Sequence, residues 1–163
     1  MKKIFAAAVL AFSTLMAHAE YEQVNLTVFG MDCAPCAHAI HVSMKGIPGV
    51  DTVAVDLNTG LVTMKLTPGN HATMRQFNEA VEKNGFTHKD AEIVARGTLS
   101  GTASAPYLEV AGTGDRFALT PLASGAEIGP LLGKAVTVAG ALPQAPKGKV
   151  GETLRYRTIG EAR

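Results

Sequence analysis

Between residues 21 and 95, the spacing of apolar residues changes repeatedly from every second position to every third or fourth position. Alternate apolar residues predict a strand with one buried face, and the longer spacing predicts a helix with one buried face. The order of the patterns is strand, helix, strand, strand, helix, strand. We therefore expect an α+β fold in which two helices cover one face of a four-stranded, ferredoxin-like βαββαβ sheet. The expected strands span 21–29, 50–57, 61–67 and 91–95, and the expected helices span 34–45 and a segment between Asn70 and Asn84.

Apolar residues that recur on one face of these elements are expected to form the core. They are Val24, Leu26, Val28, Ala37, Ile40, Met44, Val53, Val55, Leu57, Val62, Met64, Leu66, Met74, Phe77 and Val81. Gly46 and the pair 84–85 are typical of helix ends, and 58–60 is typical of a turn between paired strands. Asn70 is expected to cap the second helix.

The composition changes after Arg96, where cysteine, histidine and methionine disappear and glycine, alanine, threonine and proline become frequent. Short segments in this part have a strand pattern, 112–115 is typical of a hairpin turn, and 126–132 fits either a short helix or a loop. We therefore expect a small closed or partly closed β-barrel of the oligonucleotide/oligosaccharide-binding (OB) type. The strand-like segments are 106–110, 117–120, 136–142 and 154–159.

The first 19 residues are typical of an export signal. Two lysines precede a mostly apolar segment that is short for a membrane span, and a small-x-small sequence at 17–19 fits a cleavage site. We therefore expect a signal peptide at 1–19, a first domain at 20–96 and a barrel-like domain at 97–163. The mature chain is expected to be a soluble periplasmic protein that begins at Glu20, and an uncleaved membrane anchor is the alternative.

The charge of the chain is nearly balanced, with 15 Lys and Arg against 14 Asp and Glu in 163 residues. Binding of nucleic acid depends on a basic excess that neutralises phosphates, so we expect no nucleic-acid partner. The sequence also shows no serine–histidine–aspartate arrangement, no phosphate-binding glycine loop and no closely spaced acid pair. We therefore expect that the protein is not an enzyme.

Cys33 and Cys36 are the two cysteines of the chain, and they stand between the first expected strand and the first expected helix. Two thiolates at this spacing can bind one soft metal ion. The amide dipoles at a helix start favour negative charge and thus the thiolate form of both residues. In an exported protein the same two residues can instead form a disulfide.

The segment from 22 to 95 resembles the heavy-metal-associated domain family, which includes copper chaperones, modules of heavy-metal ATPases and a periplasmic mercury-binding protein. The family motif Gly-Met-x-Cys-x-x-Cys is met at 30–36, and Ile40 occupies a helix position that faces the core in the family. The sequence at 46–50 is similar to the family's glycine-valine turn into its second strand. The sequence at 84–86 is similar to its glycine-aromatic pair near the end of the second helix.

This resemblance implies roles for four residues. Cys33 and Cys36 are the implied metal ligands. Met31 is implied to be a buried residue that shapes the loop, and Phe86 is similar to the aromatic residue that packs beside the loop. The barrel-like segment is not part of the family's usual pattern, so the resemblance implies nothing about its role.

The metal preference of the site depends on whether the Asp32 carboxylate is a third ligand beside the two sulfurs. Two thiolates alone suit Cu(I) or Hg(II), whereas an added oxygen ligand favours Zn(II) or Cd(II). An aspartate before the first cysteine resembles the form found in zinc, cadmium and lead transporting ATPases of the family. The alternative is that Asp32 caps the following helix. His38 and His41 are expected to face solvent, and His71 and His88 are expected to be ordinary loop residues.

These observations lead to one main hypothesis and two alternatives. The main hypothesis is an extracytoplasmic heavy-metal-ion binding protein that scavenges, senses or transfers an ion, with a membrane metal transporter or another metal-binding domain as its partner. The first alternative is a thiol–disulfide redox protein that uses Cys33 and Cys36. The second is an interaction module in which these two residues form a structural disulfide.

Overall fold

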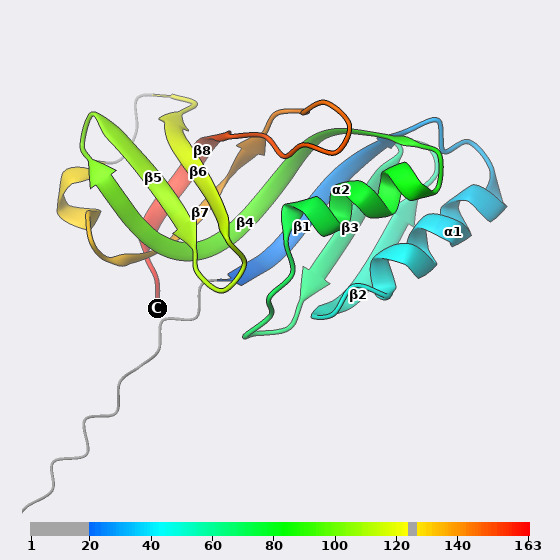
Figure 1. Cartoon of the computed structure of the whole chain (residues 1–163), viewed down its shortest axis with the longest axis horizontal. Coiled ribbons are helices and arrows are strands. Elements are labelled where there is room, and N and C mark those ends of the chain that lie inside the picture. The colour runs from blue at the N-terminus through cyan, green and yellow to red at the C-terminus, as the bar shows by residue number, and fades with distance from the viewer. Residues whose placement is uncertain (1–19, 124–126) are drawn as a thin grey trace, which may run out of the picture.

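The computed structural model describes residues 20–123 and 127–163, and the expected signal peptide at 1–19 lies outside the described residues. These described residues form two α-helices, one short 3₁₀ helix and eight strands (Figure 1). In chain order these are β1 (Glu20–Phe29), α1 (Ala34–Lys45), β2 (Val50–Asp56), β3 (Leu61–Leu66), α2 (Met74–Lys83), β4 (Thr87–Thr102), β5 (Ala105–Val110), β6 (Asp115–Pro121), η1 (Gly129–Leu131), β7 (Ala135–Leu142) and β8 (Thr153–Glu161).

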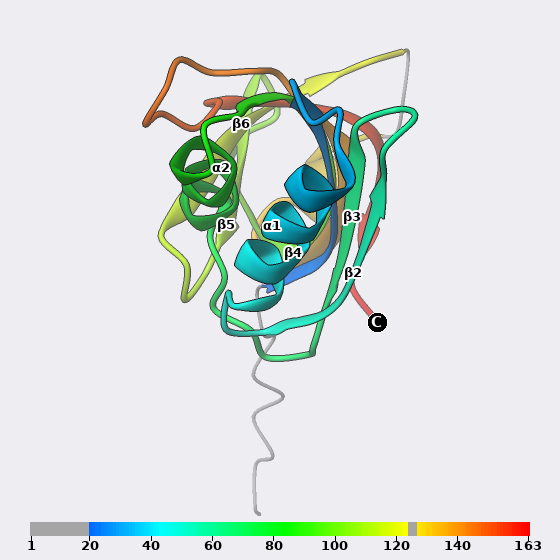
Figure 2. The ribbon, with the colours of Figure 1, turned by 90° about the vertical axis from the view of Figure 1, so that its right-hand side faces the viewer.

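The first unit is a four-stranded antiparallel sheet covered by two helices. Its strand order is β2-β3-β1-β4, and each neighbouring pair is antiparallel. The end view in Figure 2 shows α1 and α2 on the same side of the sheet. The expected ferredoxin-like βαββαβ arrangement is therefore confirmed. Buried side chains of β1, β3 and both helices fill the space between the two layers.

The second unit is a closed five-stranded barrel. The strands follow the order β4-β5-β6-β8-β7, and an additional pairing between β7 and β4 closes the ring. β6 and β8 run parallel, while the other neighbouring pairs are antiparallel. The short helix η1 lies between β6 and β7. This closed ring confirms the expected small barrel and is of the OB type.

β4 belongs to both units. Its residues 91–96 pair with β1 on one side and with β7 on the other, and its last residues, 98–102, pair with β5. At Gly97, an added Cβ would collide with the carbonyl oxygen of Glu109, so glycine permits the close approach of β5. The strand expected at 91–95 is thus part of a longer strand. The expected boundary after residue 96 falls inside it, and the division into two folding units stays a prediction.

Most of the expected core is buried, and Ala37, Val53 and Val55 are partly buried and pack against it. One expected core residue and one expected helix cap differ from the structure. Leu57 lies beyond the end of β2 and is 39% exposed. The cap of α2 is Thr73, which forms a reciprocal capping box with Gln76, and not Asn70. Asn70 is instead buried, and its side-chain amide donates to the carbonyl oxygen of Tyr21 at 2.8 Å. A strand contact 49 positions away therefore decides the role of Asn70.

Asp115 joins the barrel to the first unit. It begins β6, and its Oδ2 accepts hydrogen bonds from the Tyr21 hydroxyl at 2.6 Å and from the Met74 backbone N–H at 2.9 Å. Met74 is the first residue of α2, whose unpaired amides favour a negative charge. Tyr21 is fully buried and meets Phe77 of α2 edge-on, with ring centroids 6.4 Å apart. One carboxylate thus stabilises a helix terminus and a buried hydroxyl.

The free energy of unfolding should decrease at high pH, because Tyr21 then loses its proton. Burial, together with the negative charge and hydrogen bond of Asp115, raises the pKa of Tyr21 well above its ordinary value of 10.0. The folded state then holds this proton more tightly than the unfolded state. The resulting stabilisation is fully present below pH 10 and is lost as pH rises above 10, by up to about 1.4 kcal/mol per pH unit. Urea unfolding at pH 9 and pH 11 should show a smaller loss for Tyr21→Phe than for wild type. Equal losses in both proteins would contradict this role of Tyr21.

Candidate metal site

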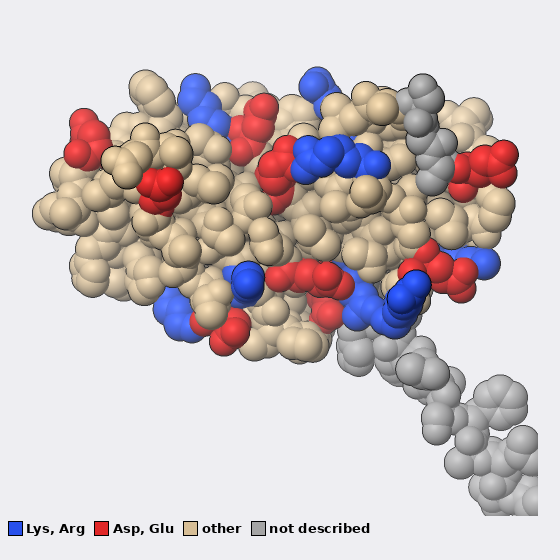
Figure 3. Space-filling model, turned by 180° about the vertical axis from the view of Figure 1, so that it is seen from behind, with Lys and Arg blue, Asp and Glu red and all other residues tan. Residues whose placement is uncertain are grey.

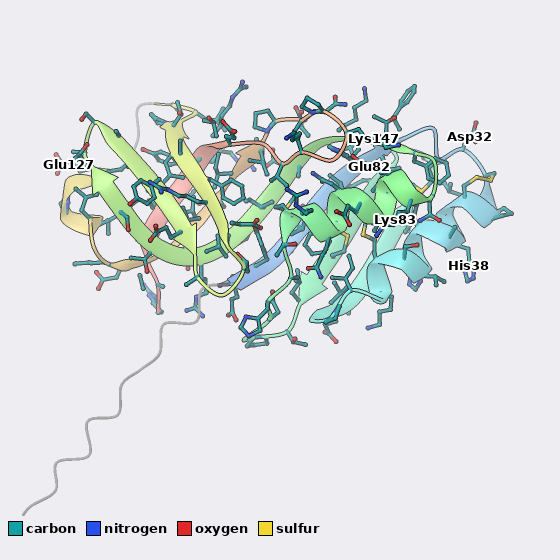
Figure 4. All side chains as sticks on the ribbon, viewed as in Figure 1. Asp32, His38, Glu82, Lys83, Glu127 and Lys147 are labelled. Carbon is teal, nitrogen blue, oxygen red and sulfur yellow. A yellow bond between two sulfur atoms is a disulfide. The ribbon has the colours of Figure 1, made fainter. Side chains whose placement is uncertain are left out.

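The two cysteines lie where β1 passes into α1, at one end of the molecule (Figure 4). Cys33 is the N-cap of α1, and its Sγ accepts a hydrogen bond from the Cys36 backbone N–H at 3.2 Å. Pro35 lies in the first turn of the helix, where its missing N–H costs no intrahelical hydrogen bond. Gly30 turns the chain out of β1 with a φ of +88°, a conformation that glycine adopts without strain. The helix start therefore directs an amide toward one of the two sulfurs.

Cys33 and Cys36 form a disulfide in this structure, with their Cα atoms 5.1 Å apart. Both residues are partly buried, so the sulfurs are neither sealed in the core nor fully exposed. A disulfide offers no thiolate, and metal binding at this loop requires reduction to the dithiol.

Asp32 lies beside the two sulfurs. One ligand atom from each of Asp32, Cys33 and Cys36 falls within 4.8 Å of the others, and Asp32 is exposed. The alternative that Asp32 caps α1 is wrong, because Cys33 occupies the cap position. The structure therefore brings the three residues into one cluster and leaves the carboxylate free of a capping role.

Met31 and Phe86 connect the metal loop to the hydrophobic core. Met31 is only 4% exposed. Phe86 follows α2 and packs against the core, and its Cδ1 would lie 3.7 Å from a Cβ placed on Gly30. Phe29, the last residue of β1, is by contrast 67% exposed, with the Lys89 ammonium 5.0 Å from its ring centroid. Both residues expected to shape the loop thus lie next to it.

Four histidines lie within the described residues, and three of them are exposed while one is buried. His38 and His41 on α1 face solvent as expected, and His71 is also exposed. His88 was expected in a loop, and this expectation is wrong: it lies in β4 and is 3% exposed. A bulge in β4 explains the error, because Leu26 pairs with Ala91 whereas Val28 pairs with His88. The bulge shifts the inward face by one residue, and simple alternation does not reveal the shift.

Comparison with known proteins identifies the first unit. Residues 25–87 match the sequence pattern of the heavy-metal-associated domain. The chain belongs to the heavy-metal-associated domain family. An uncharacterised protein of Haemophilus influenzae is 34% identical over 96 residues, which are 58% of this chain and 99% of that protein. The alignment therefore spans nearly the whole length of that relative.

Solved structures of small metal proteins are also similar to part of the chain. The CopZ metallochaperone is 29% identical, and the match covers 40% of this chain and 97% of CopZ with a TM-score of 0.38. Oxidised MerP from Ralstonia metallidurans is 20% identical, and that match covers 42% of this chain and 93% of MerP with a TM-score of 0.38.

Membership of the heavy-metal-associated domain family implies heavy-metal binding through the Cys-x-x-Cys loop. Soft ions such as Cu(I) and Hg(II) suit this pair of sulfurs. No helix within residues 20–123 and 127–163 is both long enough and apolar enough to span a membrane. On the face in Figure 3, acidic and basic side chains are interspersed, in keeping with the balanced composition.

Proposed function

We propose that the protein is an extracytoplasmic carrier that binds a heavy-metal ion through Cys33 and Cys36 and passes it to a partner. The observation that supports this proposal most directly is the cluster of Asp32, Cys33 and Cys36 at the start of α1. The amide of Cys36 stabilises negative charge on the Cys33 sulfur, which favours the thiolate that a soft ion requires. In this proposal the metal ion is cargo, and no catalytic step is involved.

The position of the loop favours transfer of the ion. The loop lies at one end of the molecule and is bordered by exposed residues (Figure 4), so a partner's thiolate can approach the bound metal. Each incoming sulfur can replace one of the two protein sulfurs, and the ion is never released to water. A membrane metal transporter or another metal-binding domain fits this exchange, because each can present thiolates of its own.

Asp32 is proposed to extend the range of metal ions that the site binds. Its carboxylate supplies a hard oxygen beside two soft sulfurs, which adds the third ligand that Zn(II) and Cd(II) favour more than linear Cu(I) or Hg(II). Since Asp32 does not cap α1, replacing it should leave the helix start intact. Its effect on metal binding can then be separated from any effect on folding.

We expect Asp32→Asn to weaken Zn(II) and Cd(II) binding by roughly tenfold while changing Cu(I) and Hg(II) binding little. The estimate corresponds to one lost charge-assisted ligand contact of about 1.4 kcal/mol. Competition titrations of the reduced protein with all four ions provide the measurement. Asp51→Asn, which removes an exposed carboxylate on β2, is the matched control and should change no affinity. A uniform weakening for all four ions would remove the case for Asp32 as a selectivity residue, whereas absence of any metal uptake would refute the carrier itself.

Export is part of this proposal, and it depends on the signal-like sequence at 1–19. The protein recovered from the producing cells is expected to begin at Glu20 and to lie outside the cytoplasm. An intact mass that includes residues 1–19 would show that the segment is retained.

Thiol–disulfide exchange is the second candidate function, and the Cys33–Cys36 disulfide is the observation that favours it. Catalysed reduction of insulin by the dithiol form, without stoichiometric metal uptake, would support this candidate over the carrier.

A further inference from the structure

The outer face of α1 carries two histidines, His38 and His41, which lie three positions apart. Residues at this spacing are neighbours on the surface of a helix, with Cβ atoms about 5–6 Å apart. Both side chains are exposed. Figure 4 shows His38 projecting from α1 away from the body of the molecule. The helix therefore presents two neighbouring imidazoles to solvent.

The direction of helical side chains brings the two rings toward each other. A side chain in a helix points back toward the helix N-terminus and covers the preceding turn, so the His41 ring leans over the turn that carries His38. The His38 ring leans in the same way over Ala34, which is exposed and ends in a methyl group. The surface beside the two rings thus has room for an ion and its water ligands.

The helix that carries the pair is fixed to the core. Ile40 and Met44 lie on the inner face of α1 and are fully buried. Among the contacts between described residues, neither His38 nor His41 has a hydrogen bond or an ion pair, and His88 is the histidine that has both. An incoming ion therefore competes with no described protein contact, and the folded helix already sets the spacing of the two ligands.

The nearest lysine on α1 is held away from the pair. Lys45 lies one turn beyond His41, and its ammonium group donates to the backbone carbonyl oxygens of Val50 and Asp51. These hydrogen bonds keep the positive charge at the C-terminal end of α1, beside the start of β2. Distance and solvent then weaken its repulsion of a cation bound by the histidines.

We propose that His38 and His41 form a second metal site, which chelates one divalent ion and prefers Cu(II) to Zn(II) or Ni(II). Imidazole nitrogen suits all three ions, and Cu(II) generally has the highest affinity for a given set of such ligands. Ligands at i and i+3 of one helix also bind together in di-iron carboxylate bundles, where a glutamate and a histidine have this spacing. Two nitrogens come from the protein here, and water completes the coordination sphere.

This second site is separate from the cysteine loop. Cys36 and His38 are two positions apart on α1, so their side chains do not face each other. Two thiolates suit Cu(I) and Hg(II), whereas two imidazoles suit divalent ions. Disulfide formation removes both thiolates but leaves the histidines unchanged. The protein would therefore retain a site for Cu(II) when its thiols are oxidised, whether or not it is a metal carrier.

The test uses the full protein with the Cys33–Cys36 disulfide intact, so that the cysteine loop cannot contribute. Substoichiometric Cu(II) is added to ¹⁵N-labelled wild type, and paramagnetic broadening is followed residue by residue. Backbone signals of residues 37–42 should broaden first, and electron paramagnetic resonance should show coupling to two imidazole nitrogens. Broadening centred on His71 or His88 instead would overturn the proposal.

Single variants then test the two ligands. His38→Gln and His41→Gln should each weaken binding of the first Cu(II) equivalent by roughly tenfold or more, because the second nitrogen of a chelating pair binds within the same molecule. Glutamine is a good helix former, and circular dichroism should confirm that α1 persists. His71→Gln removes an exposed histidine outside α1, serves as the matched control and should leave the affinity unchanged.

A relocated histidine separates chelation from a structural role. Val42 is 54% exposed and lies four positions after His38, so it is also a neighbour of His38 on the helix surface. Adding Val42→His to His41→Gln should restore most of the lost Cu(II) affinity. Wild-type affinity in either folded single variant, or no recovery in the combined variant, would overturn the proposal. Metal binding by the reduced cysteines is measured separately and does not depend on these results.

Discussion

Cys33→Ser and Cys36→Ser are each expected to reduce the affinity of the reduced protein for Cu(I) and Hg(II) by between about a hundredfold and a thousandfold. A four-ligand structural zinc site provides about 10–16 kcal/mol of binding free energy, or roughly 2.5–4 kcal/mol per ligand. Loss of one ligand on that scale corresponds to two to three powers of ten in affinity. A hydroxyl does not replace a thiolate as a ligand for a soft ion.

The fold of these variants should be preserved, which makes the measurement interpretable. Cys33 is the N-cap of α1, and serine is among the preferred residues at this position. Competition with a chromophoric chelator gives the affinity, and circular dichroism confirms the helical content. Wild type with its disulfide intact serves as a second control and should bind neither ion. Retention of wild-type affinity in either variant would refute the two-sulfur site.

Asp115→Ala is expected to destabilise the protein by roughly 2–4 kcal/mol, which is a large share of the stability of a typical domain. The substitution leaves the fully buried Tyr21 hydroxyl without an acceptor and removes the anion at the start of α2. Each unpaired buried group costs about 1–3 kcal/mol, and a charge at a helix terminus adds about 0.3–1 kcal/mol.

Urea unfolding of Asp115→Ala and Tyr21→Phe, alone and combined, measures the energetic coupling between these two residues. The double variant should lose less stability than the sum of the two single variants, because both remove the same hydrogen bond. Asp51→Ala, at an exposed position on β2, is the matched control and should change stability by less than about 0.5 kcal/mol. Additive losses would show that Asp115 acts independently of Tyr21.

Much of the fold could be predicted from the sequence because its elements are locally encoded. Alternation predicted β1 and β3, and helical spacing placed Ile40 and Met44 on the buried face of α1. Four barrel strands, β5 to β8, were located to within a few residues by the same criterion, whereas the continuation of β4 into the barrel was not. The metal loop was also predictable, since both sulfurs and Asp32 lie within five consecutive residues.

Errors occurred where a distant contact overrode a local preference. Asn70 has the chemistry of a helix cap, yet the Tyr21 carbonyl binds its amide, and Thr73 caps α2 instead. A bulge in β4 turned His88 into the core, where Glu82 meets it. Neither outcome leaves a local sequence signal, because each depends on how β1, β4 and α2 are packed together.

By itself, the sequence determined the order of strands and helices, the cysteine pair and its placement at a helix start, since each depends on residues a few positions apart. Only the tertiary structure decided that β4 serves both sheet and barrel, and that Asp115 meets Tyr21 across 94 positions. It also decided that Glu82, His88 and Gly148 converge beside one cavity. Such contacts form only when chain closure brings remote segments together, and no local propensity encodes which segments will meet.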